Sequence, residues 1–300
     1  MTTRHTPVLF ADVMDVLQPA VGKMMVDGTL GGAGHAKGLI EHGATVVGLD
    51  RDATALARVG EVAGLMKVHG NFRDLDDLLN GAGVGLVDGI LLDLGYSSDQ
   101  MDDAARGLSY QADGPLDMRL NPDQRLTAAE IVNRWDEKEI ARVLWEFGEE
   151  PKSRQIAGRL VRQRKEQPLA TTGQLMAVIE AVYPPRHQAR SHPAARTFQA
   201  LRIAVNGELD DLTTAIPHAV ARLNVGGRLA IITFNSLEDK LVKRMFQALA
   251  ADMLDNVGRV IGRAPFKVGK KIEPTDEEIT TNRRARSAKI RWLERIREED

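Results

Sequence analysis

The sequence predicts an α/β fold in which a doubly wound, mostly parallel sheet is interrupted by an inserted all-helical domain. Between residues 22 and 95, four short apolar runs alternate with helical stretches. Apolar runs spaced in this way are typical of parallel strands that helices cover on both faces. The strand pattern disappears over residues 106–202 and then returns. A length of 300 residues fits two domains.

The expected elements follow the chain in that order. Strands are predicted at 24–27, 44–50, 65–72, 87–92 and 228–234, and helices at 35–41, 52–60, 73–79, 127–134, 136–147, 153–167, 172–182, 202–223 and 238–251. The tail from Pro265 is expected to be ordered only by docking on the rest. We therefore predict a discontinuous sheet domain, residues 1–105 and 203–300, around an inserted domain, residues 106–202.

The composition is that of a globular protein that can bury a core, with 43% hydrophobic and 27% charged residues. The absence of Cys excludes disulfides, thiolate metal sites and cysteine nucleophiles, and it suits a reducing compartment. No metal site is expected from the seven His. Neither a secretion signal nor a membrane span is expected, so we predict a cytoplasmic protein.

The net charge of −2 conceals a segregation of charge along the chain. Residues 99–150 hold 13 acidic and 6 basic side chains, whereas residues 152–202 hold 10 Lys or Arg and 2 acidic ones. A basic region on a protein that is nearly neutral indicates a polyanion bound at one place. Solvated helix faces are the alternative interpretation.

Polar side chains close the four predicted strands at nearly equal spacing: Asp27, Asp50, Asn71 and Asp93. The carboxyl ends of parallel strands meet at one edge of the sheet, where ligands bind. The Gly-rich segment 31–34 fits either a dinucleotide or S-adenosylmethionine, and a sheet without a cofactor also remains open, because a lone glycine motif is weak evidence. S-adenosylmethionine is favoured, because Asp50 suits ribose hydroxyls and Asp93 would then face the reacting methyl group.

Five longer motifs resemble one known family. They begin at Asp27-Gly28-Thr29, Leu91-Leu92-Asp93, Asp113-Gly114-Pro115, His192-Pro193-Ala194 and Arg284-Ala285-Arg286. In this order they are similar to the 16S ribosomal RNA cytosine-N4 methyltransferases, the RsmH or MraW family. The resemblance covers nearly the whole chain.

The resemblance implies a Rossmann-like, S-adenosylmethionine-dependent enzyme that methylates N4 of a cytidine in the decoding region of 16S ribosomal RNA, cytidine 1402 in the usual numbering. It implies the small ribosomal subunit as partner and allows a homodimer. The implied cofactor contacts are Ala33, Gly34, His35, Asp50, Phe72, Asp93 and Gln100.

Three residues are candidates for catalysis. Asp93 is expected to accept a hydrogen from N4, with a turn cap as its alternative role. Asp117, together with Arg119, either positions the base or forms an ion pair that fixes its own loop. Asn235 stands where the family usually has His, so it can orient a base or bond to backbone but cannot titrate near neutral pH. Tyr96 likewise replaces a usual Val.

Substrate contacts are expected from a cluster facing the RNA: Arg119, His192, Arg196, Arg202 and Asn206. Helix capping is the alternative for several of them. Two other functions stay open, a methyltransferase for DNA, a small molecule or a protein, and a ribosome-assembly factor that binds S-adenosylmethionine without turnover.

Overall fold

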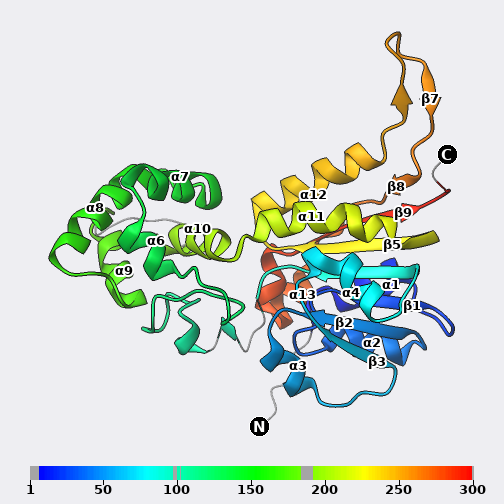
Figure 1. Ribbon diagram of the computed structural model, residues 1–300, viewed down its shortest axis with the longest axis horizontal. Helices are drawn as coiled ribbons and strands as arrows, with labels where there is room; N and C mark the ends of the chain where they lie inside the picture. The colour runs from blue at the N-terminus through cyan, green and yellow to red at the C-terminus, as the bar shows by residue number, and fades with distance from the viewer. Residues whose placement is uncertain (1–6, 97–99, 102, 184–191, 299–300) are drawn as a thin grey trace. The chain divides into compact units, whose positions relative to one another are not determined.

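The computed structural model describes residues 7–96, 100–101, 103–183 and 192–298. The chain forms two compact units, one of residues 1–95 with 209–300 and one of residues 96–208. We call them the sheet unit and the helical unit and describe each by itself (Figure 1). The predicted insertion, 106–202, lies within the helical unit, which begins ten residues earlier and ends six residues later.

The sheet unit contains a seven-stranded sheet in the order β3-β2-β1-β4-β5-β9-β8. The first five strands in this order are parallel, and β9 runs antiparallel between β5 and β8. The strands are β1 Met24–Asp27, β2 Thr45–Asp50, β3 Leu65–His69, β4 Val87–Asp93, β5 Leu223–Thr233, β8 Phe266–Val268 and β9 Lys289–Arg295. The predicted mostly parallel α/β sheet is confirmed.

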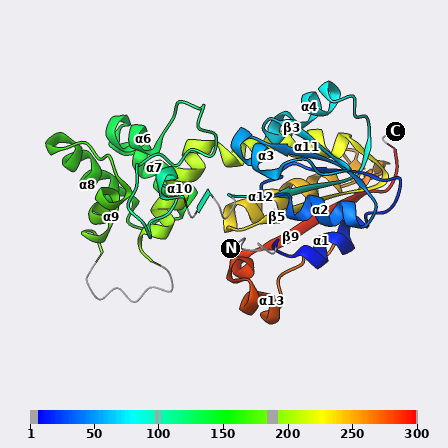
Figure 2. The ribbon, with the colours of Figure 1, turned by 90° about the horizontal axis from the view of Figure 1, so that it is seen from below.

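Helices cover both faces of this sheet (Figure 2). Along each strand successive side chains enter opposite cores, so Val26 packs with α4, α11 and α12 while Met25 packs with α1 and α2. The helices of the unit are α1 Phe10–Leu17, α2 Gly34–Glu41, α3 Ala53–Val59, α4 Leu75–Gly81, α11 Glu208–Ala221, α12 Ser236–Leu249 and α13 Asp276–Thr281, with 3₁₀ turns η1 Phe72–Asp74 and η3 Arg283–Ser287.

The helical unit buries a core of its own, to which Ile131, Leu144, Leu160 and Leu201 contribute. Its elements are η2 Ala104–Arg106, α6 Ala128–Arg134, α7 Glu137–Gly148, α8 Ser153–Glu166, α9 Thr172–Glu180 and α10 Ala194–Asn206. Among the residues described in the two units, no helix is long and apolar enough to cross a bilayer.

Two predicted elements differ in the structure. The helix predicted over 202–223 is interrupted at Gly207, whose φ of 61° ends α10 before α11 begins. The tail after Pro265 does not merely dock, because β9 inserts into the sheet and buries Ile290 and Leu293. The short hairpin of β6 Met253–Leu254 and β7 Val260–Gly262 projects from the unit with several apolar side chains exposed (Figure 1).

Asn206 joins distant segments of the helical unit. Its side-chain oxygen accepts from the Leu120 N–H at 2.8 Å, and its amide donates to the carbonyls of Met118 and Arg202, both at 2.9 Å. The residue is only 7% exposed. The amide therefore satisfies buried backbone groups that water cannot reach.

We predict that Asn206→Ala lowers the free energy of unfolding by roughly 2–4 kcal/mol, because two buried backbone groups lose their partner. Urea denaturation followed by tryptophan fluorescence measures this loss. Gln155→Ala, on the exposed face of α8, is the control and should stay within about 0.5 kcal/mol of wild type. Equal stability of the two variants would contradict this role of Asn206.

Candidate active site

Three aspartates end neighbouring strands of the sheet unit. Asp27 ends β1, and the register pairs it with Gly48 of β2 and Leu91 of β4. Asp50 and Asp93 stand two residues beyond those partners, at the ends of their own strands. Because the strand order is β2-β1-β4, the predicted ligand-binding edge has these carboxylates side by side.

Asp50 fastens the Gly-rich loop to the end of β2. One carboxylate oxygen accepts from the Gly31 N–H and the other from the Asp52 N–H, each at 2.8 Å. Burial raises the pKa of Asp50, and the neighbouring Asp52 raises it further. Each carboxylate oxygen keeps a second lone pair for a further donor.

The Gly-rich loop reaches α2 through backbone that most side chains avoid. Ala33 precedes the helix with φ of 60°, and its N–H donates to the Leu30 carbonyl. Gly34 begins α2, and a Cβ there would come within 2.5 Å of the Pro7 ring. The loop thus leads into a helix N-terminus, which favours a negatively charged ligand group, while Pro7 packs closely on Gly34.

Asp93 lacks a partner for one of its oxygens. Its Oδ1 is buried and accepts no hydrogen bond from the part of the chain described, while Oδ2 lies 3.7 Å from His35 Nδ1. About a quarter of the side chain, 26%, is exposed. Burial, with the charges of Asp27 and Glu238, raises the pKa of Asp93 to about 8. In the ligand-free protein this carboxyl is therefore largely protonated at neutral pH.

Two neighbours of Asp93 were not among the predicted site residues. Thr29 Oγ1 accepts from the Asp93 N–H at 2.6 Å and donates to Asp27 at 3.4 Å, so it connects β1 to β4. Glu238 accepts from the Phe234 N–H at 2.7 Å. The motif Asp-Gly-Thr signals Thr29, whereas Glu238 is recognisable only as the third residue after the Asn235 cap.

His35 is buried beneath the loop, with 5% of the residue exposed. Its Nε2 lies 3.0 Å from the Val8 carbonyl, and because a carbonyl only accepts, that nitrogen carries a hydrogen. Phe10 stacks on the ring with centroids 6.2 Å apart. The ring therefore positions the N-terminal segment, and the His35 backbone lies in the first turn of α2, one residue after its start.

Asn235 caps α12 instead of pointing a free amide into the site. Its oxygen accepts from the N–H groups of Leu237 and Glu238, both at 3.0 Å, and its amide donates to Glu238. This reciprocal arrangement is a capping box. The contacts favour the backbone-bonding alternative for Asn235.

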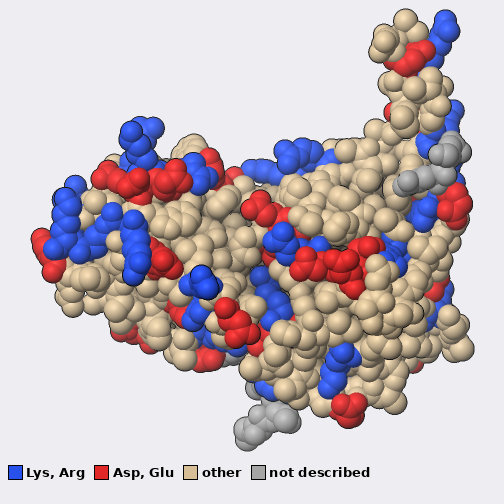
Figure 3. Space-filling view, viewed as in Figure 1, with Lys and Arg blue, Asp and Glu red and all other residues tan. Residues whose placement is uncertain are grey.

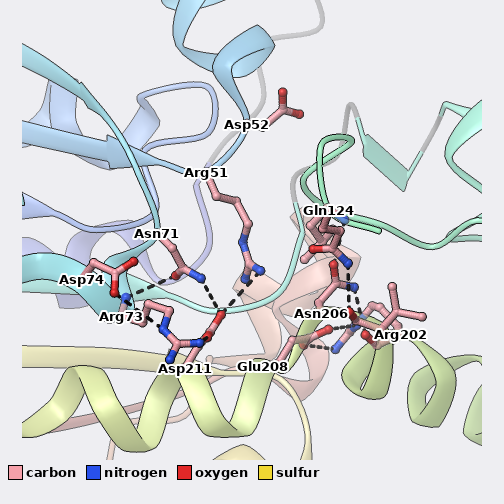
Figure 4. Close-up of polar contacts among 12 residues, drawn as sticks. Arg51, Asp52, Asn71, Arg73, Asp74, Gln124, Arg202, Asn206, Glu208 and Asp211 are labelled. Carbon is pink, nitrogen blue, oxygen red and sulfur yellow. Dashed lines mark hydrogen bonds and ion pairs between the residues drawn. The ribbon is translucent and has the colours of Figure 1, made fainter. Parts of the chain in front are cut away.

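Phe72 is buried at the end of the β3 segment, where Asn71 leads into η1. The Asn71 amide donates to Asp211 of α11 at 2.6 Å, and Arg73 donates to the same carboxylate at 3.0 Å. Arg51 lies 3.6 Å from it, as Figure 4 shows. Burial raises the pKa of Asp211 although these three groups oppose the shift.

Within the helical unit, Asp117 and Arg119 form the ion pair that was one of their two predicted roles. The guanidinium donates to both carboxylate oxygens, at 2.8 and 2.7 Å, and to the carbonyls of Pro122 and Gln124. Burial acts to raise the pKa of Asp117, but the Arg119 bonds outweigh it and lower that pKa. The pair fixes its own loop.

Arg202 and Asn206 are occupied by protein contacts. Arg202 donates to both oxygens of Glu208, at 2.8 and 2.9 Å (Figure 4). Its guanidinium also lies over the Tyr96 ring. Asn206 bonds to backbone, as described above. These contacts favour structural roles for both residues over the predicted RNA contacts.

His192 and Arg196 remain exposed at the start of α10. His192 stacks on Tyr110 at 4.9 Å, and its Nδ1 accepts from the Ala194 N–H. Arg196 has one long bond, 3.5 Å, to the Glu149 carbonyl. Gln100 is a buried residue of the helical unit. In the residues that the structure describes, no group of three His, Asp or Glu is arranged to hold a metal.

Two features define the class of protein. In the sheet, the antiparallel strand β9 lies between β5 and β8, and at the sheet edge the glycine loop faces carboxylates. These are the features of a Rossmann-like, S-adenosylmethionine-dependent methyltransferase. A family model described as the MraW methylase family matches residues 2–296. The chain belongs to this family, which confirms the resemblance seen in the motifs.

Curated relatives agree with this assignment. The chain is 47% identical to a protein of Deinococcus radiodurans, over 98% of this chain and 90% of the relative, and 44% identical to one of Thermomicrobium roseum, over 99% and 95%. Both relatives are named ribosomal RNA small subunit methyltransferase H. A solved ribosomal RNA methylase from Streptococcus thermophilus is 11% identical, covers 96% of this chain and 94% of its own, and has a TM-score of 0.43.

The raised pKa of Asp93 has a consequence for stability. Its protonated form is favoured on folding, so its contribution is fully present below the ordinary value near 4 and is lost as the pH rises towards 8. We predict that Asp93→Asn gains roughly 2–5 kcal/mol in free energy of unfolding, relative to wild type, between about pH 4 and 8.

Urea denaturation at several pH values tests this prediction. Asp77→Asn, an exposed position on α4, is the control, and its stability curve should run parallel to that of wild type. A parallel curve for Asp93→Asn as well would show that Asp93 titrates normally in the folded protein.

Proposed function

We propose that this protein transfers a methyl group from S-adenosylmethionine to N4 of a cytidine in the decoding region of 16S ribosomal RNA, cytidine 1402 in the usual numbering. The observation that carries the proposal is the Asp93 carboxyl, which has an unpartnered buried oxygen beside the glycine loop. The relatives' name, a small-subunit ribosomal RNA methyltransferase, supports the class of substrate. We expect the reaction in the cytoplasm.

The residues at this edge fit the donor. Asp50 would accept from the ribose hydroxyls through its remaining lone pairs. The backbone of Ala33, Gly34 and His35, at the start of α2, would hold the amino acid end, and Phe72 would line the adenine side. Gln100 remains a proposed cofactor contact.

The donor supplies a methyl group on a positively charged sulfur, so this chain's main task is to hold the two reacting atoms in line. Orientation of this kind is worth roughly 7–11 kcal/mol of a barrier. The N4 lone pair is delocalised into the cytosine ring. An oxygen that accepts a hydrogen from N4 makes the lone pair more available to the methyl group, and we assign that role to Asp93.

Asp93 accepts this hydrogen bond most strongly when it is ionised, because a protonated carboxyl is a weaker acceptor. With a pKa of about 8 it is mostly protonated in the ligand-free protein, because Asp27 and Glu238 add negative charge. The positively charged sulfur of a bound S-adenosylmethionine would oppose those two carboxylates and favour the ionised form of Asp93. Asp93 would therefore become the stronger acceptor when the donor is bound.

On the RNA side, the structure leaves His192 and Arg196 exposed, and we propose that they contact the substrate. Asp117, Arg119, Arg202 and Asn206 would act indirectly by shaping the helical unit, and Asn235 by fixing α12 beside Glu238. A homodimer remains a proposal without a supporting contact.

Mass spectrometry of nucleosides tests the function directly. Small-subunit RNA is incubated with the protein and isotope-labelled S-adenosylmethionine, and labelled N4-methylcytidine is the expected product. Donor binding without any labelled nucleoside would favour an assembly factor. Label in DNA, protein or metabolites but not in the RNA would assign another substrate.

We predict that Asp50→Asn lowers S-adenosylmethionine affinity roughly 10- to 150-fold, the effect of about 1.5–3 kcal/mol for hydrogen bonds to a charged group. The amide replaces one acceptor oxygen by an NH2 group, which cannot accept from the Gly31 or Asp52 N–H or from a ribose hydroxyl on that side, and it carries no charge. Isothermal calorimetry measures the affinity, with Asp77→Asn as control. Unchanged affinity would refute the pocket assignment.

We predict that Asp93→Ala lowers kcat roughly 100-fold or more while RNA affinity changes little, because the interaction exists mainly in the transition state. Donor affinity is measured alongside, since Asp93 borders that site. Loss of RNA affinity with an intact rate at saturation would contradict the assignment.

A further inference from the structure

Helix α8 carries four exposed cations without a protein partner. They are Arg154, Arg159, Arg162 and Lys165. None of them forms a hydrogen bond or ion pair with the described part of the chain. Unpaired cations of the same sign on one short helix repel one another unless an anion lies near them.

The four side chains share one face of α8. At 100° per residue they fall within an arc of about 140°, and Arg154 and Lys165 are about 16 Å apart along the axis. The opposite face, with Ile156, Ala157 and Leu160 fully buried, anchors the helix in the core of the helical unit. Figure 3 shows blue atoms over the region where Figure 1 places α8.

Two nearby cations of the helical unit are, by contrast, bonded to the protein itself. Arg142 of α7 lies between Glu139 and Glu146, at 2.9 and 2.7 Å. Arg164, on α8 itself, donates to the carbonyls of Val132 and Trp135 at 3.0 and 2.7 Å. Lys138 of α7 also forms no hydrogen bond or ion pair with the described part of the chain, but Glu137 and Glu139 flank it. Uncompensated positive charge is therefore concentrated on the α8 face.

Few acidic groups balance this face. Residues 153–166 contain five basic residues and one acidic residue, Glu166. Glu137 of α7 approaches Gly158, but it forms no ion pair with Arg162 in the described structure. Glu166 lies on the same face, four residues after Arg162, but it forms no ion pair in the described structure. Positive charge thus dominates the face from Arg154 to Lys165.

We propose that this face of α8 is a binding surface for the phosphate backbone of RNA. The proposal rests on the proposed function, which supplies the polyanion, and adds where the helical unit holds it. Three of the four cations are Arg, whose planar guanidinium matches two phosphate oxygens at once. Each phosphate that is neutralised releases counterions, which yields affinity without sequence readout.

The test compares two double variants of equal charge. Arg159→Gln with Arg162→Gln removes two cations from the α8 face, and Lys138→Gln with Arg142→Gln removes two from neighbouring α7. Binding of a transcribed decoding-region fragment of 16S RNA is measured by fluorescence anisotropy between 50 and 200 mM salt. Thermal unfolding checks that both variants are folded.

We expect the α8 variant to flatten the slope of log affinity against log salt by about 1.4, at about 0.7 for each phosphate on single strands. The ratio of wild-type to variant RNA affinity should then be up to about seven-fold larger at 50 mM than at 200 mM salt. The α7 variant should keep the wild-type slope. Arg159→Lys with Arg162→Lys should also keep it, since the charge is retained.

The outcomes separate this proposal from the proposed function. The α8 variant should keep its S-adenosylmethionine affinity, and an altered salt slope supports the surface even if no N4-methylcytidine forms. A wild-type slope in the α8 variant overturns the proposal whatever nucleoside analysis shows. Binding of poly-glutamate, a model acidic protein, is measured in the same way. If the α8 variant lost poly-glutamate binding but kept RNA binding, the face would instead be assigned to an acidic protein.

Discussion

The structure depends on two carboxyls held side by side, Asp27 at the end of β1 and Asp93 at the end of β4. Parallel pairing fixes their separation, and burial shields Asp27 and the Oδ1 oxygen of Asp93 from water. Carboxylates in such a place cannot both ionise at low cost, which is why burial raises the pKa of Asp27 to about 7 and that of Asp93 to about 8. The cores on both faces of the sheet must offset this cost, and they hold the strands in register while doing so.

Neighbouring groups connect Asp27 and Asp93 to the other strands and loops at the carboxyl edge of the sheet. Thr29 bonds to both strands, Asp50 holds the loop, and α2 begins with its N-terminus at the same place. Ala33 adopts a left-handed backbone conformation to make that turn. Strain and buried charge concentrated at one edge are expected where binding takes precedence over stability.

The sequence predicts most of this edge because its signals are local. An apolar run followed by an acid marks the ends of β1, β2 and β4, and the glycine loop follows the first of them. It could not predict contacts between distant residues, such as Asp211 with Asn71, 140 positions apart. Nor does the pattern reveal β9, because Lys289, Arg291 and Glu294 interrupt its apolar residues and resemble a solvated tail. Local charge counts also failed to separate Arg202, which is paired with Glu208, from free cations.

Electrostatics supports the proposal that chemistry and RNA binding belong to different units. The edge holds four carboxyls, Asp27, Asp50, Asp93 and Glu238, which would repel phosphates if all four were ionised. Raised pKa values remove part of that repulsion but provide no attraction. Attraction for a polyanion must therefore come from cations that no carboxylate of the protein neutralises, and the exposed face of α8 meets that condition. Because the two sets of charges lie in separately packed units, the sheet unit can keep its buried carboxyls whatever charge the proposed phosphate-binding surface of the helical unit carries.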